Sequence, residues 1–173
     1  LGANDIEFSP TLPDWKLDAI ANVPLGNHNR ICLQFEGDPF GDVPKGGFTY
    51  AESGGDNLSL LIHPFGFNKV IGVTGGRFAT WLERAGEDAS VDYVLECLAK
   101  VLGNNVKNHL VKHKVTAWGG DRWIKGAYSA ALPGQHSQRK LLRVALDDRL
   151  FFAGEATSEA SWATAHGAYL SGI

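Results

Sequence analysis

Two motifs close the sequence: Leu150-Phe-Phe-Ala-Gly-Glu155 and, nine residues after its glutamate, Thr164-Ala-His-Gly-Ala-Tyr-Leu-Ser-Gly172. The apolar run before Gly154 predicts a short buried strand, and the glycine after it lets a ligand approach the backbone closely. A carboxylate at Glu155 is placed to accept hydrogen bonds from the hydroxyl groups of a sugar. The small residues after Thr164 predict a helix whose first N–H groups lack intrahelical partners, which suits a ligand atom that gains negative charge. The composition fits equally well a small-residue helix packed tightly on a sheet.

The overall composition is that of an ordinary globular protein. The 173 residues are 44% hydrophobic and 20% charged, and this length predicts one compact body. A net charge of −3 disfavours a general binder of nucleic acids or anionic membranes, and no apolar run approaches the roughly 18 residues of a membrane span. Cys32 and Cys97 are too few for a disulfide scaffold, so we predict reduced core residues, which favours a reducing compartment such as the cytoplasm.

The ends of the sequence predict an incomplete chain. No Met is present, and no charged segment followed by an apolar one opens the sequence as a signal peptide would. Residues 166–173 are typical of a helix without a stop signal beyond it. We therefore expect a piece of a larger protein, with a processed mature chain as the alternative.

Hydrophobic periodicity predicts both helices and strands. Apolar residues at helical spacing predict three helices, over 14–23, 77–85 and 89–102. The last of them has Asp88 as a candidate cap and Gly103 just past its end. Alternating or β-branched runs predict strands over 29–35, 48–52, 58–63, 69–74 and 111–117, with a turn at 54–57 between the second and third. Because regular βαβ alternation is missing, we predict an α+β fold, a mixed β-sheet with packed helices.

Three aromatic residues stand among glycines in the C-terminal half. Trp118, Trp123 and Tyr128 fall within eleven residues that also hold three glycines. Such a segment is awkward for a regular core and suits the lining of a flat ligand or an amine. The alternative is that loop aromatics anchor the segment onto the core.

Familiar catalytic signatures are mostly missing. The sequence has no G-x-G-x-x-G, no phosphate loop ending in Gly-Lys-Ser/Thr and no G-x-S-x-G. His109 and His113 are four residues apart, but no third ligand is evident and the valines nearby favour a strand. We therefore predict no metal site.

The C-terminal motifs resemble the end of the flavin-containing amine oxidases. The match joins Leu150-Phe-Phe-Ala-Gly-Glu-Ala-Thr157 to Ala163-Thr-Ala-His-Gly-Ala-Tyr-Leu-Ser-Gly172, whose ending is most similar to polyamine oxidases and lysine-specific histone demethylases. Other segments agree in order: Ile6–Lys16 resembles the entry to the substrate domain, Gly26–Ile31 the strand of the active-site lysine, and Thr116–Ser129 the W…G-x-Y-S loop. The resemblance covers nearly the whole chain and is weakest over about 37–67.

The resemblance implies a domain organisation. Residues 1–145 would be a fragment of the substrate-binding domain, and residues 146–173 the C-terminal part of the FAD-binding domain, a short strand and helix that contact FAD. The family's N-terminal dinucleotide-binding half is absent from the sequence. Because its glycine fingerprint holds the FAD pyrophosphate, we expect the isolated fragment neither to retain FAD tightly nor to turn over.

The resemblance also implies site residues. Those implied to bind FAD are Trp118, Trp123, Gly154, Glu155, Thr164 and Ala165. Tyr128 and Ala163 would contact the substrate, with Tyr128 also in a catalytic role. Arg30 stands at the position of the family's catalytic lysine, and because arginine stays charged it cannot take the lysine's water-linked role in the same way. Ala127 stands where the monoamine oxidases carry a flavin-linked cysteine, which implies non-covalent FAD.

The implied activity is oxidation of a small-molecule amine, with a polyamine-like substrate. In the family, hydride leaves the carbon beside the amine nitrogen for flavin N5, the imine hydrolyses, and oxygen reoxidises the flavin to give H2O2. An amino-acid oxidase or a desaturase-type flavoenzyme is the alternative within flavin chemistry. A non-catalytic binding module that keeps the fold is the alternative outside it. No nucleic-acid or membrane partner is expected, and the sequence does not determine the oligomeric state.

Overall fold

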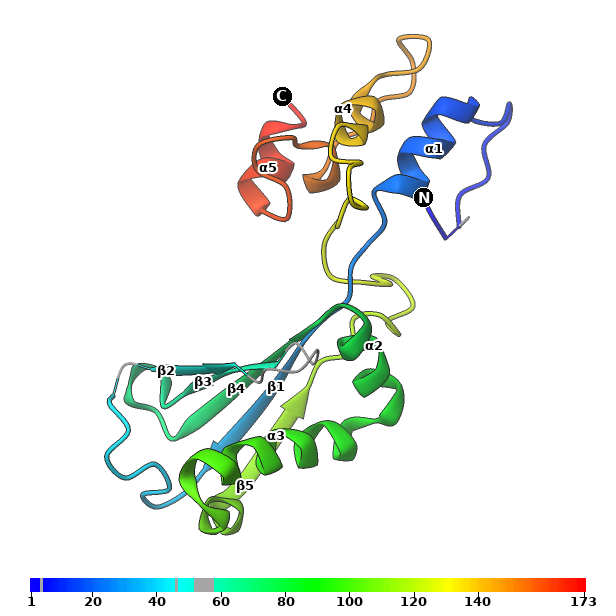
Figure 1. Ribbon diagram of the computed structural model, residues 1–173. Helices are drawn as coiled ribbons and strands as arrows, with labels where there is room; N and C mark the ends of the chain where they lie inside the picture. Colours follow the sequence, from blue (N-terminus) through cyan, green and yellow to red (C-terminus); the bar gives the residue numbers. More distant parts are fainter. Residues whose placement is uncertain (4, 46, 52–57) are drawn as a thin grey trace. The chain divides into compact units, whose positions relative to one another are not determined.

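A computed structural model describes residues 1–3, 5–45, 47–51 and 58–173, which form two compact units (Figure 1). The sheet unit comprises Asn27–Ala127, and the helical unit comprises Leu1–Gly26 together with Tyr128–Ile173. These units do not follow the boundary expected after residue 145, because residues 1–26 and 128–145 pack with the C-terminal segment. The assignment of residues 1–145 and 146–173 to functional domains stays a prediction.

The sheet unit is built on five strands in the order β2-β3-β4-β1-β5. They are β1 (His28–Phe35), β2 (Phe48–Ala51), β3 (Leu58–Ile62), β4 (Lys69–Gly75) and β5 (Leu110–Val115). The α+β class and the predicted strands are confirmed, whereas every described pairing is antiparallel, so the sheet is not mixed in direction. The turn predicted at 54–57 lies outside the described residues.

Alternation along β1 decides which of its side chains enter the core. Ile31, Leu33 and Phe35 are buried, and Cys32 and Gln34 between them are exposed. The prediction that Cys32 is a core residue is therefore wrong. A strand sends successive side chains to opposite faces, and Cys32 falls on the face opposite the core.

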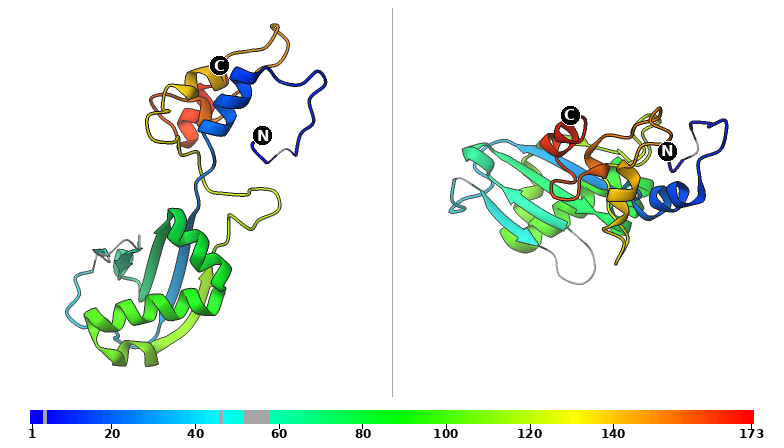
Figure 2. Two further views of the ribbon diagram at one scale, coloured as in Figure 1. Left: turned by 45° about the vertical axis from the view of Figure 1, so that its right-hand side comes forward. Right: turned by 90° about the horizontal axis from the view of Figure 1, so that it is seen from above.

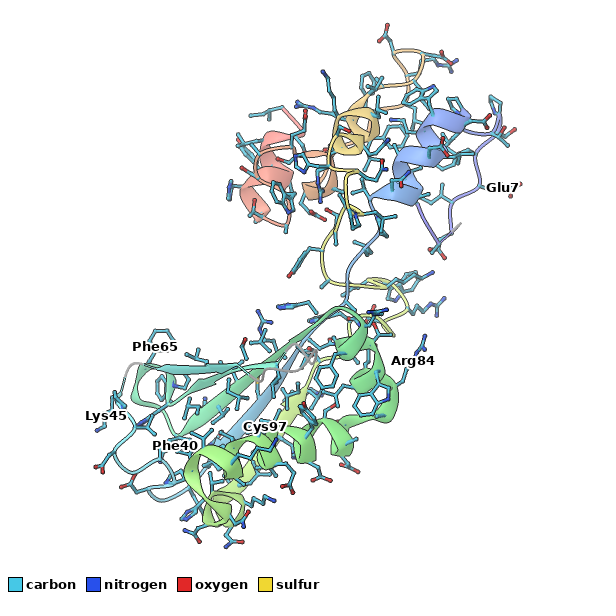
Figure 3. The ribbon with its side chains drawn as sticks, viewed as in Figure 1. Glu7, Phe40, Lys45, Phe65, Arg84 and Cys97 are labelled. Atoms are coloured by element: carbon cyan, nitrogen blue, oxygen red, sulfur yellow. The ribbon has the colours of Figure 1, made fainter. Side chains whose placement is uncertain are left out.

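Two helices cover one face of this sheet. They are α2 (Gly76–Ala85) and α3 (Glu87–Leu102), and Figure 2 shows α3 running across the sheet. Cys97 of α3 is buried as predicted, between the helix and the sheet (Figure 3). A Cβ added at Gly72 would lie 3.0 Å from Val94 Cγ2, so this glycine lets helix and sheet approach closely. Short 3-10 turns occupy Pro64–Gly66 and Asn104–His109.

The ends of α3 agree only in part with the sequence. Gly103 follows the helix with a φ of 83°, as expected of a C-terminal glycine. The N-cap is Gly86 and no side chain caps the helix, so the prediction of Asp88 as the cap is wrong. Asp88 lies within the first turn instead, where a carboxylate complements the helix dipole.

The described residues of the helical unit form three short helices and a 3-10 turn. They are α1 (Asp14–Asn22), α4 (Gln138–Arg143), α5 (Ala165–Leu170) and η3 (Glu155–Thr157). Ala19 of α1 and Val23, which follows the helix, pack on Leu142 of α4. The strand predicted at 150–153 does not form: the segment makes only an isolated bridge between Leu146 and Leu150, and one bridge gives no ladder. None of the described helices has both the length and the apolar character needed to cross a membrane.

Lys16 joins α1 to the end of α4. Its buried ammonium donates to the carbonyl oxygens of Leu141 at 2.9 Å, Leu142 at 2.9 Å and Val144 at 2.6 Å. It also lies 4.0 Å from the ring centroid of Phe152. Burial lowers the pKa of Lys16, and the three carbonyls at the negative end of a helix compensate the charge.

Replacing Lys16 by methionine tests this connection. Lys16→Met keeps most of the aliphatic chain but leaves three carbonyls without their donor, so we expect a loss of about 1–3 kcal/mol in the free energy of unfolding. Urea denaturation followed by tryptophan fluorescence measures it. Lys140→Met, at an exposed lysine of α4, is the matched control and is expected to change stability by under about 0.5 kcal/mol. Equal losses in both variants would contradict the role of Lys16.

Candidate functional site

One carboxylate connects three separate segments of the helical unit. Glu155 Oε1 accepts a hydrogen bond from the backbone N–H of Ser129 at 2.8 Å. Its Oε2 accepts from the hydroxyl of Ser129 at 2.7 Å and from the backbone N–H of Ala163 at 2.8 Å. Ser129, the turn after Gly154 and the residue before Thr164 therefore meet at Glu155.

A buried arginine is linked to this carboxylate through Ser129. Arg139 of α4 is 1% exposed, and its Nη1 donates to Ser129 Oγ at 2.6 Å and to the carbonyl of Ala156 at 3.0 Å. Its Nη2 donates to the Ser129 carbonyl at 3.3 Å. Burial lowers the pKa of Arg139, and the negative charge of Glu155 acts to raise it. The Ser129 hydroxyl accepts a hydrogen bond from the Arg139 guanidinium and donates one to the Glu155 carboxylate, so it bridges the two charged groups.

Glu155 also holds a strained residue at the start of α5. Ala163 has a φ of 60°, a left-handed conformation that costs a residue with a Cβ roughly 1–2 kcal/mol. The hydrogen bond from its N–H to Glu155 compensates that cost. Thr164 then caps the helix: its hydroxyl accepts from the N–H of Gly167 at 3.0 Å and donates to the carbonyl of Ser161 at 2.6 Å. The carboxylate thus fixes where α5 begins.

The two glycines of this region have different structural reasons. Gly154 has a φ of 138°, and a Cβ added there would meet no heavy atom within 4 Å, so space is open beside it. Its N–H donates to Ser171 Oγ at 2.8 Å, which ties the turn to the end of α5. A Cβ at Gly167 would lie 1.9 Å from the Ser161 carbonyl oxygen, so only glycine permits this approach.

The aromatic residues divide between the two units. Trp118 and Trp123 belong to the sheet unit and Tyr128 to the helical unit. Trp123 is 80% exposed, with the Arg122 guanidinium 4.4 Å from its ring centroid. Trp118 and Tyr128 are each more than one-third exposed. None of the three residues is buried in the core of its unit.

Arg30 lies on β1 of the sheet unit. Its Nη1 is 2.9 Å from Nδ1 of His28, the neighbour two residues along the strand. Burial, and then the charge of Arg30, lower the pKa of His28, so the imidazole stays neutral over a wider pH range. Among the described residues, no group of three or more His, Cys, Asp or Glu side chains could hold a metal ion, at this pair or elsewhere.

Two members of the Glu155 cluster were missed by sequence reasoning. Ser129 lies in the W…G-x-Y-S segment, in which the sequence pattern singles out only the aromatic residues. Arg139 lies on a six-residue helix beside the exposed Lys140 and Arg143. The sequence offers no sign that this arginine, rather than its neighbours, is the buried one.

The chain belongs to the family of flavin-containing amine oxidoreductases, which it matches over residues 1–173. The resemblance seen in the two C-terminal motifs is thereby confirmed. Gly154, Glu155 and the start of α5 belong to the two C-terminal motifs that carry this resemblance.

The curated relatives include polyamine oxidases and histone demethylases. The chain is 34% identical over 174 residues to polyamine oxidase 5 of Oryza sativa subsp. japonica, an alignment that covers 100% of this chain and 35% of that protein. It is 32% identical over 189 residues to a possible lysine-specific histone demethylase 1 of Drosophila melanogaster, covering 99% of this chain and 21% of that protein. The chain therefore spans about a third of the length of the polyamine oxidase and less of the demethylase.

Replacing Arg139 tests the cluster. Arg139→Met leaves the Ser129 hydroxyl and the carbonyls of Ser129 and Ala156 without their buried donor, and it leaves the negative charge of Glu155 uncompensated. We therefore expect a loss of about 3–5 kcal/mol in the free energy of unfolding. Arg143→Met removes an exposed arginine from the same helix and is expected to cost under about 0.5 kcal/mol. Chemical denaturation of both variants measures the difference. Arg139 would be dispensable if its variant unfolded at the same denaturant concentration as the control.

Proposed function

We propose that the complete protein carrying this chain is an FAD-dependent amine oxidase with a polyamine-like substrate. Membership of the flavin-containing family and alignment of the whole chain with proteins named polyamine oxidase support the proposal. The observation that carries it is the Glu155 cluster, in which residues far apart in the sequence are held around one carboxylate next to an open glycine turn.

The residues around Glu155 fit FAD. A carboxylate has about four lone-pair positions, and the described protein donors use three, which leaves one on Oε1 for a ribityl or ribose hydroxyl. Gly154 leaves space for the cofactor beside the turn. Thr164 and Ala165 would present backbone N–H groups to the pyrimidine ring, and Trp118 and Trp123 would flank the flavin. Tight, non-covalent retention of FAD would also need the dinucleotide-binding half that is expected in the complete protein.

The substrate would be a neutral amine. Bound FAD would accept the hydride from the carbon beside the nitrogen, and amine, water and oxygen would be converted in total to a carbonyl compound, a shorter amine and H2O2. Tyr128 and Ala163 would contact the substrate, with Tyr128 orienting the nitrogen. An aromatic, apolar surrounding disfavours the ammonium form and so lowers the pKa of the amine.

Arg30 supports a second candidate, a flavin-binding module without oxidase activity. A guanidinium stays charged and cannot reproduce a lysine that works through a bound water. Its contact with His28 further engages the side chain that would have to act. Amino-acid oxidation or desaturation by the same cofactor would be accommodated by the same flavin-contacting residues.

Flavin spectroscopy of the complete protein separates these candidates. We expect a visible flavin spectrum that is bleached by a polyamine under anaerobic conditions and restored by oxygen with release of peroxide. Bleaching by amino acids alone would favour the amino-acid oxidase. A protein that binds FAD and is bleached by no amine in a broad panel would contradict the oxidase and support the non-catalytic module.

A further inference from the structure

A second carboxylate, Glu83 of α2, binds a backbone turn of the sheet unit. Its Oε2 accepts hydrogen bonds from the side-chain amides of Asn27 at 2.9 Å and Asn29 at 2.7 Å. The backbone N–H of Gly119 donates to the same oxygen at 3.3 Å, and the N–H of Gly120 donates to Oε1. Glu83 is half-buried, whereas the next residue of the helix, Arg84, points outward (Figure 3).

Asn29 extends this network to the tryptophan before the turn. Its Oδ1 accepts from the backbone N–H of Trp118 at 3.1 Å and from the hydroxyl of Thr116 at 3.1 Å. Asn29 itself is 3% exposed, so its amide has little access to water and depends on these partners. The N–H groups of residues 118, 119 and 120 are thus all bound by two side chains.

The energetics favour an ionised, fixed Glu83. Burial acts to raise the pKa of Glu83, but hydrogen bonds from the two asparagines and the two glycines outweigh it and lower the pKa. The glycines are needed for the close approach, since a Cβ at Gly119 would lie 2.8 Å from Asn27 Nδ2 and one at Gly120 would lie 3.0 Å from Glu83 Oε1. A carboxylate only accepts hydrogen bonds, so it matches four converging donors better than an amide would.

We infer that Glu83 is a positioning residue that fixes residues 118–120 and thereby the place of the Trp118 indole. Trp118 is 38% exposed, so packing around the residue restrains it only in part and the hold on its backbone matters. That the fixed indole serves the flavin or the amine rests on the proposed function. The hold on the backbone does not, because it follows from the hydrogen bonds alone.

The variant Glu83→Gln tests the inference in the complete protein with FAD added. Glutamine keeps the size and packing of glutamate but turns a donor toward other donors. Labelling tryptophan carbonyls with 13C and glycine nitrogens with 15N selects Trp-Gly amides, of which this sequence has one, Trp118-Gly119. The resonance that disappears in Trp118→Phe assigns the Gly119 amide in the complete protein. We expect Gly119 to exchange its amide proton at least about tenfold faster in the variant, with a shifted resonance. Glu96→Gln on α3, which removes a surface ion pair with Lys107, is the control and is expected to leave Gly119 unchanged.

The amine kinetics give the second readout. Because Trp118 would flank the flavin, we expect Glu83→Gln to shift the flavin absorbance spectrum or to raise KM several-fold, while most of kcat is kept. An unchanged Gly119 resonance and exchange rate would overturn the inference, whatever the activity. A loosened Gly119 with unchanged KM and flavin spectrum would overturn the positioning role while leaving the proposed oxidase intact. Absence of bleaching by any amine would count against the proposed function only, because the Gly119 measurement does not depend on it.

Discussion

The helical unit is held together by the hydrogen bonds that the Glu155 carboxylate and the Arg139 guanidinium make with protein groups in place of water. Arg139 is buried at a cost that only hydrogen bonds and an opposite charge can offset. Ser129 and Glu155 supply both, and the carboxylate in turn holds Ala163 in a left-handed conformation. The start of α5 and the turn at Gly154 follow from that constraint, so charge pairing at the base of the cluster sets backbone geometry at its surface.

The sheet unit uses the same device at another place. Glu83 and Asn29 bind the consecutive N–H groups after Thr116, just as Glu155 binds those of Ser129 and Ala163. In each unit an acceptor-only side chain, carried on a helix or a 3-10 turn, replaces the strand or helix partner that an irregular backbone lacks. Both loops belong to segments that resemble motifs of the family, and side chains that support a backbone in this way hold its geometry in place.

The sequence predicted the regular elements better than the irregular ones. The period-two pattern of 29–35 and the long apolar stripe of 89–102 identified β1 and α3, because burial imposes those periods directly. The prediction of a strand at 150–153 was wrong because an apolar run does not show whether a neighbouring strand exists to pair with it. The prediction that Cys32 is a core residue was wrong because it rested on the general preference of cysteine for the core. The alternation along β1 places Cys32 on the opposite face.

The candidate site was predicted in its motifs but not in its supports. Glu155 and Gly154 stood out by their place after an apolar run, and Thr164 by its place before small residues. Arg139, Ser129 and Glu83 had no such local signal, since their roles arise from contacts between residues 10 to 56 positions apart. Long-range hydrogen bonds of this kind are set by the tertiary fold, which a single sequence shows only through a resemblance.

The most direct test of the central claim is an experimental structure of the complete protein with FAD bound. The account predicts that Glu155 keeps its contacts with Ser129 and Ala163, that Arg139 stays buried beneath them, and that a cofactor hydroxyl takes the remaining position on Oε1. FAD bound elsewhere, or a Glu155 side chain turned away from Ser129 and Ala163, would contradict it.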